Sequence, residues 1–208
     1  MWYSFLISFV LTAALGADAS VKLPLFETLV IGKHSISGSI APLQAKELLH
    51  SKECRNASHT PPASDKFAEI DRNLLQGRCW IVEQVAQATP PTARLFSPAL
   101  SEFTDIDQLS ESLFPPRSDG DSFKISRQGN VIEITSGLAE NGFLPGYTVR
   151  YHLISRGSFN HQKSEEILFR KESSANGATF SECEMVILGE KDGSKIDVIA
   201  RKAIGRCA

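Results

Sequence analysis

Apolar and polar positions alternate along the C-terminal part of the chain, residues 118–208. Cys183, Met185 and Ile187, for example, share one side of an extended chain, whereas Glu182 and Glu184 share the other. A period of two is typical of β-strands that bury one face and leave the other largely in solvent. Runs of this kind lie near residues 122–127, 130–136, 147–155, 165–172, 179–189 and 194–203.

Short turn sequences separate these runs. Asn-Gly and Asp-Gly favour tight hairpins because both residues accept a positive φ. Strands joined by such short connections must be antiparallel. We therefore predict an α+β fold in which N-terminal helices pack on a mainly antiparallel meander of about six C-terminal strands, either curled or partly closed into a barrel. The turns are expected at Gly129-Asn130, Asn141-Gly142, Arg156-Gly157, Asn176-Gly177 and Asp192-Gly193.

Before Pro115-Pro116 the pattern is mixed and predicts both strands and helices. The residues that flank Gly32-Lys33 predict a hairpin of Thr28–Ile31 with His34–Ser37. Pro42 favours the first position of a helix that runs to about Ser51.

A second helix is better marked, because Phe67, Ile70 and Leu74 recur at helical spacing. Ser64 is expected to cap it and Gly77 to end it. The next run, Cys79–Val82, is rich in β-branched and aromatic residues and predicts a strand that stops before Pro90. A further short helix is expected from Asp105 to Leu113.

The N-terminus carries the pattern of a secretory signal. The run from Phe5 to Leu15 has no charge, and Ala17-Asp18-Ala19 has the small-x-small form of a cleavage site. Ala14-Leu15-Gly16 is the alternative site, and an uncleaved anchor is the alternative fate, because no Lys or Arg precedes the run. The run is too short for a spanning helix, which needs about 20 residues.

We therefore expect a signal peptide at residues 1–19 and one exported α+β domain at residues 20–208. Its helix-containing part covers residues 20–117 and its sheet covers residues 118–208. After cleavage we expect no permanent membrane anchor, and the mature protein would be secreted or periplasmic. Bacterial and eukaryotic sources both stay open, so Asn56-Ala57-Ser58 is a possible glycosylation sequon only in the second case.

Charge excludes some partners. The chain has 22 basic and 24 acidic residues, and loss of Asp18 with the signal leaves 22 against 23, a net charge of −1. This balance gives no field that favours nucleic acid or an anionic membrane. The expected partner is therefore an unknown small ligand, lipid or protein.

Four cysteines are expected to form two structural disulfides in an exported protein. Three pairings are possible, and we favour Cys54–Cys79 with Cys183–Cys207. The first pair can close a helical hairpin, whereas the second needs the tail to bend back after the last strand. His50, Cys54 and His59 superficially suggest zinc, but they lack a paired ligand motif. We predict no cofactor.

Arg150 and His152 are the only ligand-binding candidates, and no residue is assigned a catalytic role. Both share one side of the run near 147–155, where a concave sheet face would place them in a pocket for an anionic group. The alternative is a solvated face. We predict an exported, non-catalytic binding or interaction protein. The alternative is a small secreted hydrolase with a dispersed Ser, His and Glu site.

Overall fold

The computed structural model describes residues 21–57, 65–91, 110–115, 123–136, 146–160, 164–175, 177–179, 181–191 and 195–206. Several predictions from the sequence lie outside these residues. They are the signal peptide at 1–19, the Ser64 cap, the Asn141-Gly142 and Asp192-Gly193 turns, Cys207, and the expected helix from Asp105 as far as residue 109.

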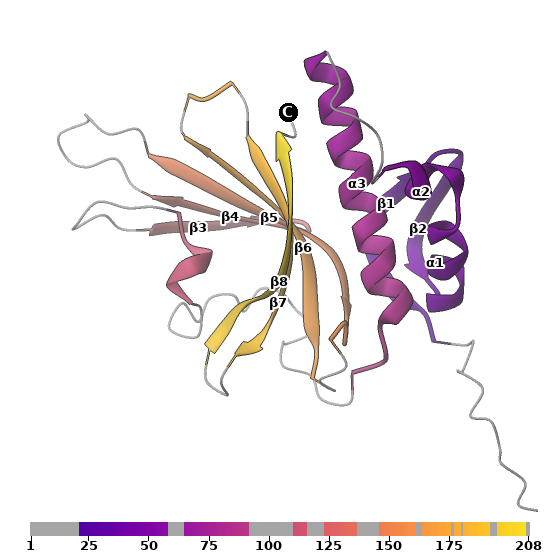
Figure 1. The fold of residues 1–208 in the computed structure, drawn as a ribbon. Helices are drawn as coiled ribbons and strands as arrows, with labels where there is room; N and C mark the ends of the chain where they lie inside the picture. The colour runs from indigo at the N-terminus through magenta and orange to yellow at the C-terminus, as the bar shows by residue number, and fades with distance from the viewer. Residues whose placement is uncertain are drawn as a thin grey trace, which may run out of the picture.

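The described chain is mainly an antiparallel sheet with a few helices (Figure 1). Its elements are β1 (Leu23–Ile31), β2 (His34–Ile40), α1 (Pro42–Leu49), α2 (Lys52–Ala57), α3 (Lys66–Gln87), the 3₁₀ turn η3 (Glu111–Leu113), β3 (Phe123–Gln128), β4 (Val131–Ser136), β5 (Tyr147–Gly157), β6 (Glu166–Ala175), β7 (Glu182–Lys191) and β8 (Lys195–Arg206).

All eight described strands belong to one sheet, with the order β2-β1-β5-β6-β7-β8. Strand β4 also pairs with β5, and β3 pairs with β4. The sheet is open, so the alternative of a partly closed barrel is wrong. The six predicted C-terminal strands are confirmed, and Gly129, with φ of 60°, makes the predicted turn between β3 and β4. The turn expected at Arg156-Gly157 is wrong, because both residues belong to β5 and pair with Ile167 and Glu166 of β6.

The predicted N-terminal hairpin is also confirmed, with Leu29 opposite Ile36 and Ile31 opposite His34. It joins the sheet beside β5, where Leu25 lies opposite Ser155. The Ser155 hydroxyl donates a hydrogen bond to the Pro24 carbonyl at 2.8 Å and strengthens this junction. The first described elements are therefore strands of the sheet, and the helices follow them.

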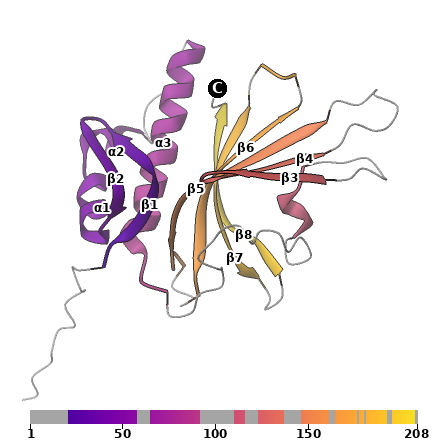
Figure 2. The same ribbon diagram turned by 180° about the vertical axis from the view of Figure 1, so that it is seen from behind.

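Helix α3 connects the two parts of the fold. Figures 1 and 2 show it between the hairpin with α1 and α2 on one side and the remaining strands on the other. The Asp65 carboxylate caps its first turn by accepting hydrogen bonds from the Phe67 and Ala68 amides at 3.4 and 3.2 Å. The helix contacts β1, β7 and β8 as well as α1 and α2.

Two predictions for this region are wrong. Helix α3 does not end at Gly77, and Cys79–Val82 continue it rather than form a strand. Burial outweighs β propensity here, because Val82 is fully buried at a helical position. At Gly77 the helix lies so close to the sheet that an added Cβ would be 2.7 Å from Met185 Cε.

The sheet is buried on both faces near its centre, and the expectation of one largely solvated face is wrong there. In β7, for example, Ile187 packs under the helices whereas Val186 and Leu188 pack on the opposite face. Leu113 and Phe114, around η3, contribute to the core on that opposite face, which we call the second core. Strands buried on both faces have apolar runs instead of strict alternation.

Candidate functional site

Arg150 and His152 both lie on the face of the sheet that carries α3, since they alternate along β5 with residues of the second core. Arg150 is half-exposed, and its Nε lies 2.7 Å from Oε2 of Glu133 on β4. The Glu133 carboxylate therefore already forms an ion pair with this guanidinium within the sheet.

His152 lies in a partly buried network of charged side chains. Its Nδ1 is 3.6 Å from Glu27 Oε1, and its Nε2 is 3.2 Å from Glu172 Oε1. Arg170 approaches the same two carboxylates, with Nη2 3.4 Å from Glu27 and Nε 3.3 Å from Glu172. The network joins β1 to β5 and β6 across the hairpin junction.

The carboxylates of Glu27 and Glu172 beside His152 disfavour the binding of an anion at this site. Any anion that approached His152 would have to displace Glu27 or Glu172 or be repelled by them. Recognition of an anionic group by Arg150 and His152 stays a prediction, because no described contact tests it. A cavity of about 50 Å³ next to the network is lined by Glu27 and Arg170. That volume suits a few water molecules.

The network lowers the pKa of Glu172. The main cause is its hydrogen bond with His152; burial opposes the shift, and the charges of His152, Arg170 and Arg150 add to it. A carboxyl whose pKa is lower in the folded state contributes stability at neutral pH, and this contribution is lost as the pH falls through the folded pKa.

Replacing Glu172 by Gln is therefore expected to destabilise the protein on the order of 1 kcal/mol at pH 6 and less at pH 3. The native carboxyl begins to lose its advantage below about pH 4.3, where a free glutamate protonates. Urea unfolding at the two pH values measures this difference. Glu47→Gln, at an exposed position on α1, is the control. A penalty that stayed equal at both pH values would contradict the linkage.

A larger groove, of about 320 Å³, lies along α3 and is lined by residues of α1, α2, α3 and β8. We call it the α3 groove. Its lining combines apolar and aromatic groups with three polar side chains. The lining residues are Leu49, Cys54, Ala57, Gln76, Cys79, Trp80, Glu83 and Lys202. Its volume falls in the range of about 300–1,000 Å³ that is usual for small-molecule sites.

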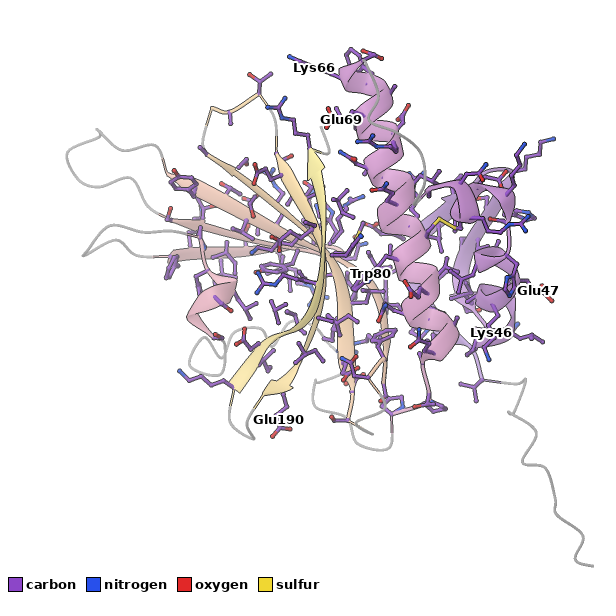
Figure 3. The ribbon with its side chains drawn as sticks, in the orientation of Figure 1. Lys46, Glu47, Lys66, Glu69, Trp80 and Glu190 are labelled. Carbon is purple, nitrogen blue, oxygen red and sulfur yellow. A yellow bond between two sulfur atoms is a disulfide. The ribbon has the colours of Figure 1, made fainter. Side chains whose placement is uncertain are left out.

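Three of the residues that line the α3 groove belong to one side of helix α3. Gln76, Trp80 and Glu83 stand four and three residues apart, so their side chains project from one side of α3. Figure 3 shows Trp80 between α3 and the strands, with the yellow disulfide on the other side of the helix. Lys202 reaches the groove from β8.

Covalent and hydrogen bonds hold the opposite wall, which α1 and α2 provide. Cys54 and Cys79 form a disulfide, as predicted, and its Cα atoms are 5.4 Å apart. The Gln76 amide donates a hydrogen bond to the Ala57 carbonyl at 2.7 Å and fixes the end of α2. Cys183 is also disulfide-bonded, whereas Cys207, its expected partner, lies outside the described residues.

The charged side chains of the α3 groove are available to interact with a ligand. Within the ranges that the structure describes, neither Glu83 nor Lys202 has an ion-pair partner, and they do not pair with each other. The Gln76 side chain already donates one amide hydrogen to the Ala57 carbonyl, but its Oε1 can still accept a hydrogen bond. The groove thus combines an indole ring with one anionic and one cationic side chain.

Sequence reasoning missed this groove because it assigned Cys79–Val82 to a strand. On a strand Trp80 and Glu83 would point to opposite faces, whereas on a helix they lie together. The signal that could have revealed the helix is the spacing of Leu74, Ile81 and Val85, which continues the pattern of α3 through Gly77. Lys202 carries no such signal, because only the tertiary fold brings β8 to this helix.

The candidate zinc ligands can be compared with the described residues. No group of three His, Cys, Asp or Glu side chains in this part of the chain could hold a metal ion. The disulfide also removes the Cys54 thiolate from the zinc set considered with His50 and His59. Among the described helices none is both long and apolar enough to cross a membrane.

Comparisons of the chain with models of known protein families, with curated proteins and with solved structures found no match.

Proposed function

We propose that this protein is an exported binding protein that holds a small amphipathic ligand in the α3 groove without transforming it. The observation that carries the proposal is the groove itself, where the Trp80 ring and apolar side chains adjoin Glu83 and Lys202, neither of which has an ion-pair partner among the described residues. Such a combination of an apolar surface with a few convergent polar groups is typical of ligand sites.

Export is supported by the sequence and by the covalent structure. The apolar run at Phe5–Leu15 and the cleavage motif that ends at Ala19 have the layout of a signal peptide. The disulfide between Cys54 and Cys79 suits an oxidising compartment, either the periplasm or the extracellular space. After cleavage the mature chain would start at Ser20.

Native mass spectrometry of the protein purified from its own host tests both parts of the proposal. We expect the mass of residues 20–208, increased by that of a bound small molecule that denaturation releases. Recovery of the bare mature mass alone would contradict ligand binding. Recovery of the chain from Met1 would contradict cleavage. Conversion of the released molecule to a product by the purified protein would favour the hydrolase alternative.

Two sets of variants locate the ligand. Trp80→Ala is expected to abolish ligand retention, whereas the double replacement of Arg150 and His152 by alanine is expected to leave it unchanged. The opposite result would place the ligand at the sheet face and contradict a site in the α3 groove. Circular dichroism of each variant shows whether the fold is kept.

A further inference from the structure

The two charges of the α3 groove differ in sign and come from different elements. Glu83 follows Trp80 by three residues on α3, whereas Lys202 belongs to β8. Because the two groups are not within ion-pair distance of each other, neither neutralises the other.

Charges in this arrangement favour ligands that carry both signs. A ligand with one charge would satisfy one of the two side chains and meet the wrong sign at the other. A neutral ligand would displace water from both charged groups without replacing their interactions, which costs free energy. A zwitterion can satisfy both side chains at once.

The apolar part of the groove lining suits a ring. Trp80 offers an aromatic surface, and Leu49, Ala57 and the Cys54–Cys79 disulfide give the groove its apolar wall. An aromatic ring gains contact area on such a surface and prefers offset or edge-to-face packing against the indole. An indole face also attracts a nearby cation, and that effect supports an ammonium group beside Glu83, which follows Trp80 by three residues on α3.

We propose that the α3 groove binds an amphipathic zwitterion, of which a free aromatic amino acid is the simplest example. Its ammonium group binds the Glu83 carboxylate, its carboxylate binds the Lys202 ammonium, and its ring packs on Trp80. This assignment rests on the proposed binding function and adds the chemical class of the ligand.

The mature chain contains its own reporter for this test. The sequence has two tryptophans, and Trp2 lies in the expected signal peptide, so Trp80 is the only one left in residues 20–208. Its fluorescence can follow titrations of the mature protein with four probes. They are L-phenylalanine, phenylethylamine as the cation, 3-phenylpropionate as the anion, and benzyl alcohol as the neutral ring.

We expect L-phenylalanine to bind at least about tenfold more tightly than any of the other three probes, a difference of about 1.4 kcal/mol. Glu83→Gln should weaken L-phenylalanine and phenylethylamine but spare 3-phenylpropionate. Lys202→Met should weaken L-phenylalanine and 3-phenylpropionate but spare phenylethylamine. The matched controls, Glu69→Gln and Lys66→Met on the exposed first turn of α3, should change none of these affinities.

Two results would overturn the assignment. The first is equal binding of a singly charged or neutral probe, and the second is an unchanged L-phenylalanine affinity in both groove variants. The proposed binding function is tested separately, by titrating the mature protein with the molecule recovered from the host. It fails if that molecule does not change the fluorescence of Trp80. If that molecule binds while L-phenylalanine does not, the zwitterion assignment is wrong and the binding function stands.

Discussion

Replacing both Cys54 and Cys79 by alanine is expected to lower the free energy of unfolding by about 3 kcal/mol. The bond closes a loop with a sequence separation of 25 residues and ties α2 to α3. Without it the unfolded chain gains conformational freedom, whereas the folded chain loses only a small buried contact. Urea unfolding followed by circular dichroism measures the difference.

The single variants are the control for this result. Either Cys54→Ala or Cys79→Ala breaks the bond, so each alone should cost about as much as the double variant. Additive costs would show that side-chain packing, rather than the cross-link, supplies the stability. The disulfide also forms part of the wall of the α3 groove. We therefore expect weaker ligand binding in all three variants, even under conditions where they are folded.

The antiparallel strands could be predicted because their signals are local. Alternating burial and tight turns depend on neighbours in the chain, and the turn at Gly129-Asn130 has the expected positive φ. The same holds for the hairpin around Gly32-Lys33. The Cys54–Cys79 pairing could be inferred for a similar reason, because the two residues lie on consecutive stretches of the chain that were expected to pack together.

Helix α3 shows where local signals mislead. Trp80, Ile81 and Val82 have side chains that favour strands, but the helix buries Ile81 and Val82 against the rest of the core. The free energy gained by burying large apolar side chains, about 1.5–3 kcal/mol each, exceeds the difference in propensity, which spans about 1 kcal/mol.

The candidate site depends on contacts that no short stretch of sequence contains. Glu27 and Arg170 are 143 residues apart in the chain, yet their side chains meet beside His152. The α3 groove likewise combines Leu49 of α1 with Lys202 of β8. A sequence pattern can place a residue on a face of its own element, but only the packing of several elements decides which residues share a groove.

Phe169→Ala is the second replacement with a large expected effect. Phe169 is fully buried in the second core, where its ring packs edge-to-face against Tyr151 with centroids 5.7 Å apart. Removing the ring leaves a cavity, and such changes cost about 3–5 kcal/mol. That is a large part of the stability of a domain, which is usually about 5–15 kcal/mol. Urea unfolding measures the loss.

The Phe169→Ala variant also tests whether a loss of stability by itself weakens ligand binding. Its side chain lies on the face of the sheet opposite α3, so the folded fraction of the variant should bind ligand with unchanged affinity, in contrast to the disulfide variants. If Phe169→Ala does not fold, Phe169→Leu can replace it, because leucine keeps part of the side-chain volume. Phe169→Leu should still lower the free energy of unfolding more than Tyr147→Ala, which lies at a half-exposed position of the same sheet. A cost equal to that of Tyr147→Ala would contradict a tightly packed second core.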